Sequence, residues 1–381
     1  MYSIPSFPPL NDSECEQALE SPIGTNSLSH IVKGKKRVVI GIEDATRPAY
    51  LGNILEILAQ LINESGIERK NIKIINAIGA HKPNTLNELE KKLGKNILSK
   101  CSVYNHSPFE NLIKTGIRIG PVELEVNRFF WESDARIVIG SVMPHAFAGY
   151  SGGAKLIIPG LASIDILQWT HKYVMMGFRG GIGIIDGNRF REEIEEAIGK
   201  MGIHFSINLI VNNEQCVQNI YAGDIVKSHR VAVEKAKNIY TTKVSREIVH
   251  DILLLNSFPK DTDLFQADAA LNVLRSGDID WVRENGTIVI TTASTQGLGS
   301  HNLFEFGKCL YKKPMQKRLL KNRLLIVYSP TVYEPEFRQI YWDGYMLFNR
   351  WTDLRDYLRE KHGNTPTVGI FPTASLQIVE Q

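Results

Sequence analysis

Short runs of β-branched and other apolar residues, separated by segments with helical periodicity, most constrain how this chain folds. Such runs occupy residues 37–42, 72–78 and 136–142, and apolar residues at helical spacing follow the first two, over 50–64 and 85–93. Strands that are apolar along their whole length are typical of parallel sheets covered by helices on both faces. The sequence therefore predicts an α/β fold with mainly parallel sheets.

A second block of the same kind begins near residue 249. Its predicted strands are 252–255, 287–291, 324–327 and 368–371, with a helix around 264–274. A chain of 381 residues is long enough for two domains of ordinary size. We therefore expect an N-terminal α/β domain over 1–245 and a C-terminal α/β domain over 246–381, with an active-site cleft between them. The last strand could instead return to the first domain.

Composition narrows the class of protein. The net charge of +3 is small and no basic stripe with interleaved aromatic residues is present, so nucleic acid is not an expected partner. No apolar run approaches the roughly 20 residues of a membrane span, and the N-terminus lacks the pattern of a signal peptide. The four cysteines are scattered without a paired spacing. We expect a soluble, cytoplasmic protein.

Polar segments follow three strands of the first domain, at residues 43–48, 79–83 and 144–155. Ligands bind outside the carboxyl ends of the strands in open α/β sheets, so these segments indicate a functional site. Arg47 offers a planar guanidinium suited to a substrate carboxylate, and Asp44 could orient it. A salt bridge that only closes the loop is the alternative interpretation.

His81 and His145 lie in the second and third of these segments. Imidazole has an unperturbed pKa of about 6.5, which suits proton transfer near neutral pH. Two histidines that face each other across a small ligand would suit a reaction that adds or removes a proton on either face.

The glycine-rich segment 149–155 ends in Lys155, and His171 follows on a predicted helix. Its glycines permit close backbone approach, and consecutive N–H groups could cradle an anion, beside which a lysine is a counter-charge or a nucleophile. The segment matches neither GxxxxGK[ST] nor GxGxxG. A single imidazole cannot hold a transition metal tightly without other ligands.

Together these motifs resemble the nickel-dependent lactate racemase family, whose pattern has a DxTRP element, a GxHRP-like element, a PHxxAGYSGGxK element and a later helical histidine. This chain has 44–48, 79–83, 144–155 and His171 in the same order and at matching spacings. The long glycine-bearing motif is specific, whereas the short ones are not. The similarity covers most of the chain.

The resemblance implies a racemase or epimerase of 2-hydroxy acids with a nickel-pincer nucleotide cofactor, which accessory enzymes make from a nicotinic-acid precursor. The cofactor would be covalently attached to Lys155, and His171 would fill the remaining nickel position. For its phosphate, the turn Ser151, Gly152 and Gly153 is one candidate cradle.

The resemblance also implies a mechanism of reversible hydride transfer. A hydride would leave C2 for the cofactor and return to the opposite face. His81 and His145 would exchange the hydroxyl proton, and Arg47 would hold the carboxylate.

One departure from the family pattern concerns the second domain. Lactate-specific members have a glutamine and, three positions later, a lysine that assist the substrate carboxylate. Gln296 is present here, but Gly299 stands in place of the lysine. A 2-hydroxy acid other than lactate is therefore the expected substrate, and His301 is either a substitute contact or a surface residue.

Two other functions remain open from the sequence. One is a zinc-dependent hydrolase or lyase in which His81, His145 and His171 bind the metal directly. The other is a non-catalytic relative that binds a small acid or a nucleotide.

Overall fold

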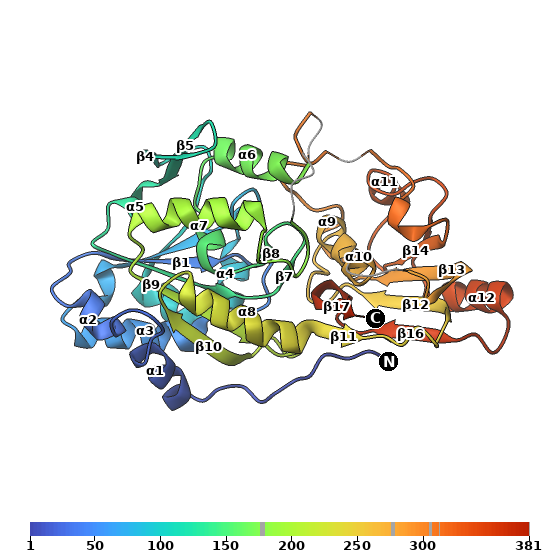
Figure 1. Cartoon of the computed structure of the whole chain (residues 1–381), viewed down its shortest axis with the longest axis horizontal. Coiled ribbons are helices and arrows are strands. Elements are labelled where there is room, and N and C mark those ends of the chain that lie inside the picture. Colours follow the sequence, from blue (N-terminus) through green and yellow to red (C-terminus); the bar gives the residue numbers. More distant parts are fainter. Residues whose placement is uncertain (176–179, 276–278, 305–306, 312, 381) are drawn as a thin grey trace. The chain divides into compact units, whose positions relative to one another are not determined.

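Two parallel sheets, one in each of two compact units, organise the chain (Figure 1). The N-terminal unit is Ser6–Asn238, and the C-terminal unit combines Met1–Pro5 with Ile239–Gln381. The computed structural model describes residues 1–175, 180–275, 279–304, 307–311 and 313–380.

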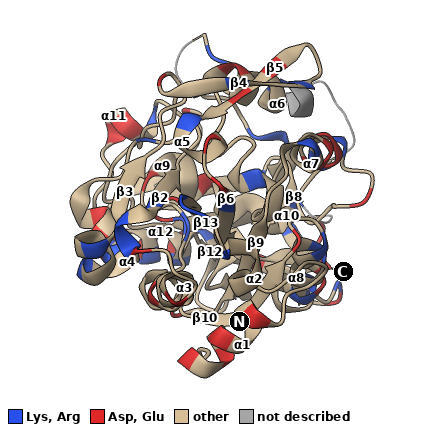
Figure 2. Cartoon of the chain, turned by 90° about the vertical axis from the view of Figure 1, so that its left-hand side faces the viewer, with Lys and Arg blue, Asp and Glu red and all other residues tan. Residues whose placement is uncertain are grey.

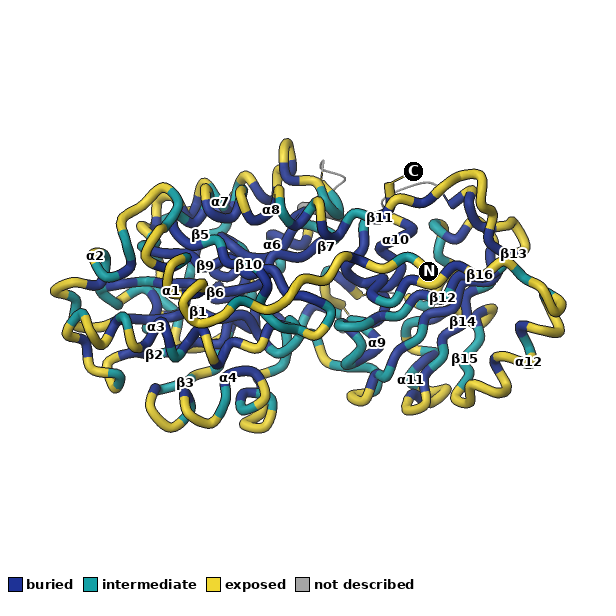
Figure 3. Tube along the Cα trace, turned by 90° about the horizontal axis from the view of Figure 1, so that it is seen from below, coloured by how far each residue is buried: buried dark blue, intermediate teal, exposed yellow. Residues whose placement is uncertain are grey.

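The sheet of the N-terminal unit has six strands, and all neighbours are parallel except the edge pair β10 and β9. In spatial order the strands are β10 (Val217–Gly223), β9 (Phe205–Val211), β6 (Ala135–Ser141), β1 (Val38–Glu43), β2 (Ile72–Ala77) and β3 (Ser102–Asn105). Strand β1 lies between β6 and β2, and every one of its residues is buried (Figure 3).

Helices cover both faces of this sheet because β1 and its neighbours are apolar on both sides. Val38, Ile40 and Ile42 share a hydrophobic cluster with the first four helices, whereas Val39 belongs to a cluster with helices on the other face. The helices are α1 (Asp12–Glu20), α2 (Leu28–Val32), α3 (Gly52–Glu64) and α4 (Leu86–Lys100) on the first face, and α5 (Arg128–Trp131), α6 (Ile164–Met175) and α7 (Arg189–Met201) on the second. Two antiparallel hairpins, β4 (Leu112–Ile119) with β5 (Val122–Asn127) and β7 (Pro144–His145) with β8 (Gly149–Tyr150), and helix α8 (Lys227–Tyr240) complete these elements.

The C-terminal unit has a five-stranded sheet that is parallel throughout. Its strands, in spatial order, are β15 (Met346–Phe348), β14 (Leu324–Tyr328), β13 (Val282–Thr291), β12 (His250–Asn256) and β16 (Val368–Phe371); β11 (Thr241–Lys243) and β17 (Ile378–Glu380) form a separate pair. The helices are α9 (Leu264–Ala267), α10 (Asn272–Arg275), α11 (Glu334–Phe337) and α12 (Trp351–His362). The predicted α/β class with mainly parallel sheets is confirmed.

Two details differ from the expectations. The single helix expected around 264–274 is divided by a 3-10 turn, Asp268–Leu271, between α9 and α10. The strand at 368–371 pairs with β12, so it stays within the C-terminal unit and does not return to the first sheet.

The first residues of the chain belong to the C-terminal unit. The ring of Tyr2 stacks on Phe371 at a centroid distance of 4.7 Å, and its hydroxyl lies 3.2 Å from Nε2 of His250. The backbone N–H of Tyr2 donates to Ile370, and its carbonyl accepts from Gln377, both at 2.8 Å. The chain therefore passes between the two units twice, at Pro5–Ser6 and at Asn238–Ile239.

Lys and Arg residues are interspersed with Asp and Glu residues along the ribbon in Figure 2. Within the described parts of the chain, no helix combines the length and the apolar character that a membrane crossing requires.

His106 connects three parts of the N-terminal unit just beyond the end of β3. It is buried, its Nε2 donates to the carbonyl of Ala162 at 3.0 Å, and its Nδ1 accepts from the Asn127 side chain at 3.4 Å. Burial lowers the pKa of His106 to about 4, although the Ala162 carbonyl opposes this by favouring the charged form. The neutral imidazole therefore holds the segment that leads into α6.

This lowered pKa makes the stability of the chain depend on pH. Between about pH 6.5 and 4 the unfolded chain binds a proton that folded His106 does not, so the stability it contributes is present above pH 6.5 and is lost as the pH falls. In urea unfolding over this range, His106→Gln should reduce the pH slope by up to about 1.4 kcal/mol per pH unit. His30→Gln, at an exposed position, is the control. An unchanged slope in His106→Gln would contradict the assignment.

Candidate functional site

Three polar segments meet at one edge of the N-terminal sheet. Residues 44–48, 79–83 and 144–155 follow β1, β2 and β6, which are neighbouring parallel strands. Glu43 at the end of β1 pairs with Ala77 at the end of β2, so the segments start at similar heights. The segments therefore lie next to one another, as expected from the topology of parallel strands.

Asp44 and His81 form a buried carboxylate–imidazole pair between the first two segments. Asp44 Oδ2 contacts His81 Nδ1, and Asp44 Oδ1 accepts from the Thr46 hydroxyl at 2.5 Å. Burial by itself would raise the pKa of Asp44, but the charge and hydrogen bond of His81, aided by Arg47 and Thr46, lower it below its usual range. With the Nδ1 proton bound to Asp44, the Nε2 atom of His81 carries the lone pair of a base. Asp44 therefore contacts His81 directly, and it is connected to Arg47 through the Thr46 hydroxyl.

Arg47 keeps its guanidinium available for a ligand. Its one side-chain hydrogen bond goes from Nη1 to the Thr46 hydroxyl at 3.3 Å, and among the described residues it forms no ion pair. The structure thus does not support the alternative of a salt bridge that closes the loop. A half-buried guanidinium beside a histidine base suits a small carboxylate.

His145 has a different hydrogen-bonding pattern from His81. Its Nδ1 accepts from the backbone N–H groups of Phe147 at 3.1 Å and Ala148 at 3.2 Å. The proton of the neutral ring is therefore on Nε2. When both rings are neutral, Nε2 of His145 is therefore a hydrogen-bond donor, whereas Nε2 of His81 is an acceptor.

The glycine-rich segment uses much of its hydrogen-bonding capacity within the protein. The N–H of Ser151 donates to Met143 at 2.8 Å, and that of Gly153 donates to the Asn208 side chain at 3.1 Å. Ser151 is buried, and its hydroxyl donates to Ser141 at 2.7 Å. The structure therefore gives no support to a phosphate cradle in which Ser151, Gly152 and Gly153 present all their donors to a ligand.

Two buried side chains that were not predicted from the sequence form hydrogen bonds to the backbone carbonyls of this segment. Arg191 of α7 contacts the carbonyls of Ala148, Tyr150 and Gly152, and His229 of α8 donates from Nε2 to Ser151 at 2.8 Å. Arg191 is fully buried and is paired with Glu195 at 3.6 Å. A signal was available in the sequence, because Arg191 shares the apolar side of α7 with Ile194 and Ile198.

Lys155 and His171 lie on neighbouring elements after the glycine segment. Lys155 is on a 3-10 helix, Gly153–Leu156, and His171 is a buried residue of α6. His171 Nδ1 donates to the carbonyl of Leu167 at 2.7 Å, which leaves the Nε2 lone pair for coordination. Burial lowers the pKa of His171 to about 4, the Leu167 carbonyl opposes this, and the charges of Lys155 and His81 add to the lowering.

The aromatic ring of Phe147 contacts both His145 and His171. It meets His145 edge-on at a centroid distance of 5.8 Å and His171 at 5.7 Å. The residues predicted to form the site in the N-terminal unit therefore gather around one edge of its sheet. Over the part of the chain that the structure describes, however, no three His, Cys, Asp or Glu side chains form a group able to hold a metal ion. His81, His145 and His171 do not make the zinc site of the alternative prediction here.

The remaining predicted residues lie in the loop after β13 of the C-terminal unit. Gln296 is exposed, and His301 accepts at Nδ1 from the Leu303 N–H at 3.2 Å. Gly299 has a φ of +87°, and a Cβ there would lie 2.5 Å from Cγ of Asp263. A lysine at this position would need a different loop conformation.

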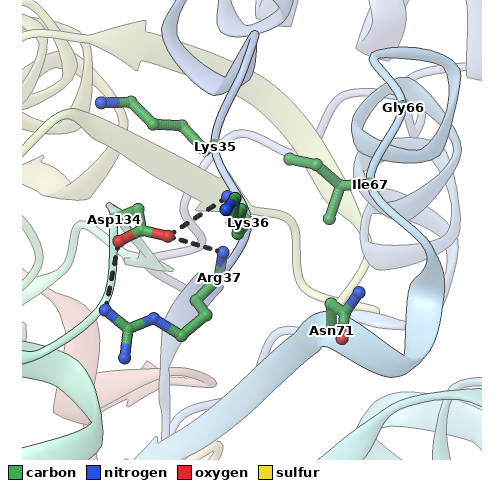
Figure 4. Close-up of a pocket in the computed structure, with 7 residues that line it drawn as sticks. All are labelled: Lys35, Lys36, Arg37, Gly66, Ile67, Asn71 and Asp134. Carbon is green, nitrogen blue, oxygen red and sulfur yellow. Dashed lines mark hydrogen bonds and ion pairs between the residues drawn. The ribbon is translucent and has the colours of Figure 1, made fainter.

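A cavity of about 550 Å³ lies at the opposite edge of the N-terminal sheet (Figure 4), lined by Lys35, Lys36, Arg37, Gly66, Ile67, Asn71 and Asp134. Asp134 accepts from the backbone N–H groups of Lys36 and Arg37 and pairs with the Arg37 guanidinium at 3.2 Å. The protein's own carboxylate thus occupies these anion-binding donors. The lining residues precede their strands, so this cavity is separate from the candidate site.

Comparison with known proteins agrees with the motifs. Residues 5–182 match the lactate racemase N-terminal domain family. The chain is 27% identical over 299 residues to the lactate racemase of Thermoanaerobacterium thermosaccharolyticum. This alignment covers 77% of this chain and 68% of that protein. It is 26% identical over 294 residues to the lactate racemase of Lactiplantibacillus plantarum, with coverages of 76% and 68%.

Two solved structures share the fold. The lactate racemase apoprotein from T. thermosaccharolyticum aligns with a TM-score of 0.80 at 22% identity, covering 100% of this chain and 94% of that one. A Thermotoga maritima protein aligns with a TM-score of 0.74 at 19% identity, covering 99% of both chains. The resemblance predicted from the motifs is confirmed: residues 5–182 match the lactate racemase N-terminal domain family, and the chain is similar to lactate racemases in sequence and in fold.

Proposed function

We propose that this protein is a nickel-dependent racemase or C2-epimerase of a 2-hydroxy acid, and that its substrate is not lactate. The observation that carries the proposal is the convergence of Arg47 with the Asp44–His81 pair at the edge that also bears His145 and Lys155. A carboxylate-binding cation beside an oriented base is what the deprotonation of a 2-hydroxy acid requires. Gly299, which leaves no room for the lysine of lactate-specific members, supports a different acid.

The cofactor would be held by Lys155 and His171. The donor set suits a nickel-pincer nucleotide, because a neutral imidazole with its Nδ1 proton fixed on Leu167 is a good ligand for Ni(II) and the cofactor brings its own sulfur and carbon ligands. When bound, this cofactor supplies reversible acceptance of the C2 hydride. Its synthesis by accessory enzymes makes those enzymes functional partners of this chain.

The protein's own residues would handle the substrate carboxylate and the hydroxyl proton. Arg47 would bind the carboxylate through two parallel N–H···O hydrogen bonds of its guanidinium. His81 would take the hydroxyl proton at Nε2, and Asp44 would stabilise the resulting imidazolium. His145 starts as a donor, so it can take up a proton only if Nδ1 gives up its bonds to Phe147 and Ala148. Gln296 would assist from the C-terminal unit, which we propose closes over the site and excludes water. Cys15, Cys101 and Cys216 carry free thiols, which agrees with the reducing, cytoplasmic environment that we propose.

Racemase activity is tested with protein co-expressed with the cofactor-synthesis enzymes. Purified protein is incubated with single enantiomers of a panel of 2-hydroxy acids, and the products are separated by chiral chromatography. We expect interconversion of at least one acid with a higher kcat/KM than lactate. If protein shown by mass spectrometry to carry the cofactor leaves every acid unchanged, the proposed function is wrong.

Alanine variants of Lys155 and His171 should differ in which they lose, the covalently attached cofactor or the nickel. Lys155→Ala should lose the covalent mass increment of the cofactor together with nickel and activity. His171→Ala should keep the increment and hold less nickel than the wild type, because one ligand of the metal is removed while the ligands of the cofactor remain. Intact-protein mass spectrometry and metal analysis separate the two, and a full increment in Lys155→Ala would refute the attachment site.

Asp44→Asn should lower kcat by about 100-fold or more, because an amide no longer stabilises the protonated form of His81 or fixes its tautomer. The cofactor increment on Lys155 should remain. Thr46→Val removes the hydroxyl that bonds Asp44 and accepts from Arg47 Nη1, but it leaves the Asp44 carboxylate in place, so kcat should fall less than tenfold. Equal kcat values in Asp44→Asn and the wild type would show that the pair has no part in turnover.

A further inference from the structure

Lys92 is a buried cation that the chemistry described so far does not use. It lies in α4 with 5% of its surface exposed, and its ammonium makes three contacts, the full number of its donors. Nζ lies 3.1 Å from Oε1 of Glu43, 3.0 Å from the carbonyl of Arg47 and 3.1 Å from the carbonyl of Ala49. The two carbonyls flank Pro48, in the loop that carries Arg47.

The backbone of Lys92 holds the same loop. Gly94 has φ 76° and ψ 155°, which interrupts the helical geometry of α4. The carbonyl of Lys92 instead accepts from the N–H of Leu51, at 2.8 Å. Side chain and main chain of one residue thus fix both the middle and the end of residues 47–51.

The carboxylate of Glu43 ties this arrangement to the sheet. Its other contacts are the backbone N–H and the hydroxyl of Ser141, at the end of β6. Glu43 and Lys92 are each 4% exposed in their side chains. A buried ion pair is costly to desolvate and often adds little to stability compared with apolar residues of similar volume. The directional bonds of the ammonium to the Arg47 loop are therefore what this pair adds beyond packing.

We propose that Lys92 is a positioning residue: it fixes the backbone of the Arg47 loop so that the Arg47 guanidinium can bind the substrate carboxylate. This inference rests on the proposed function, since it assumes that Arg47 binds that carboxylate. Arg47 has no carboxylate partner of its own among the described residues, and Pro48 limits the backbone that follows it. The position of its main chain then depends on the bond from the Arg47 N–H to the Asp44 carbonyl, at 3.1 Å, and on the bonds that Lys92 makes to the two carbonyls.

The test uses the double variant Glu43→Gln/Lys92→Met in the full chain, because it removes both charges and leaves neither unpaired in the interior. Arg69→Met is the control: it removes the 2.8 Å Arg69–Glu56 ion pair near the start of β2, at the other edge of the same sheet. Three quantities are measured: KM and kcat of the cofactor-loaded protein, the cofactor mass on Lys155, and hydrogen–deuterium exchange of residues 44–51.

The double variant should raise KM for the 2-hydroxy acid at least tenfold, with a smaller change in kcat and the cofactor mass retained. Exchange in 44–51 should increase. Arg69→Met should leave KM within twofold of the wild type and exchange in 44–51 unchanged. A folded double variant with wild-type KM and exchange overturns the positioning role. If the wild type racemises no acid, the proposed function fails, and unchanged exchange in 44–51 would still refute the role of Lys92 by itself.

Discussion

The parallel pairing of β6, β1 and β2 is the constraint on which the candidate site depends. Parallel strands end at the same edge, so the segments that follow them are brought together whatever their distance in sequence. Because β1 is buried on both faces, the polar residues at its end enter a region of low dielectric constant. Each of them must be paired, and the pairs in turn define the shape of the site.

Two such pairs have different consequences. Asp44 and His81 form a pair that faces the site and changes how a proton is held. Glu43 and Lys92 form the second pair, and the bonds of Lys92 to the backbone carbonyls of Arg47 and Ala49 hold the loop in place. Glu43 and Asp44 are adjacent in sequence, but successive side chains of an extended chain point to opposite sides. Proton chemistry and loop geometry are thus assigned to adjacent carboxylates.

Much of the fold was predictable because its strands are short apolar runs. Strand β9 and its antiparallel edge partner β10 were not predicted; in β9, the polar residues Ser206 and Asn208 interrupt the apolar pattern. At the site, the motifs indicated which residues to consider but not their partners. Spacing along the chain suggested Asp44 for Arg47, whereas the sheet brings His81 to Asp44 from the neighbouring strand. Lys92 gave only a weak signal, a cation at a helical position near Leu89 and Leu93. Its role depends on the interruption at Gly94, which no periodicity encodes.

The attachment of Tyr2 to the C-terminal unit has a consequence for synthesis on the ribosome. The ring of Tyr2 stacks on Phe371, and its main chain bonds to Ile370. These partners are made long after Tyr2, while the N-terminal unit lies between them in sequence and can fold first. Tyr2 and its neighbours therefore wait as an unpaired tail until the last strands emerge. An expressed fragment that starts at Ile239 would lack this partner at the strand edge, and the part of the Phe371 ring that Tyr2 covers would face water.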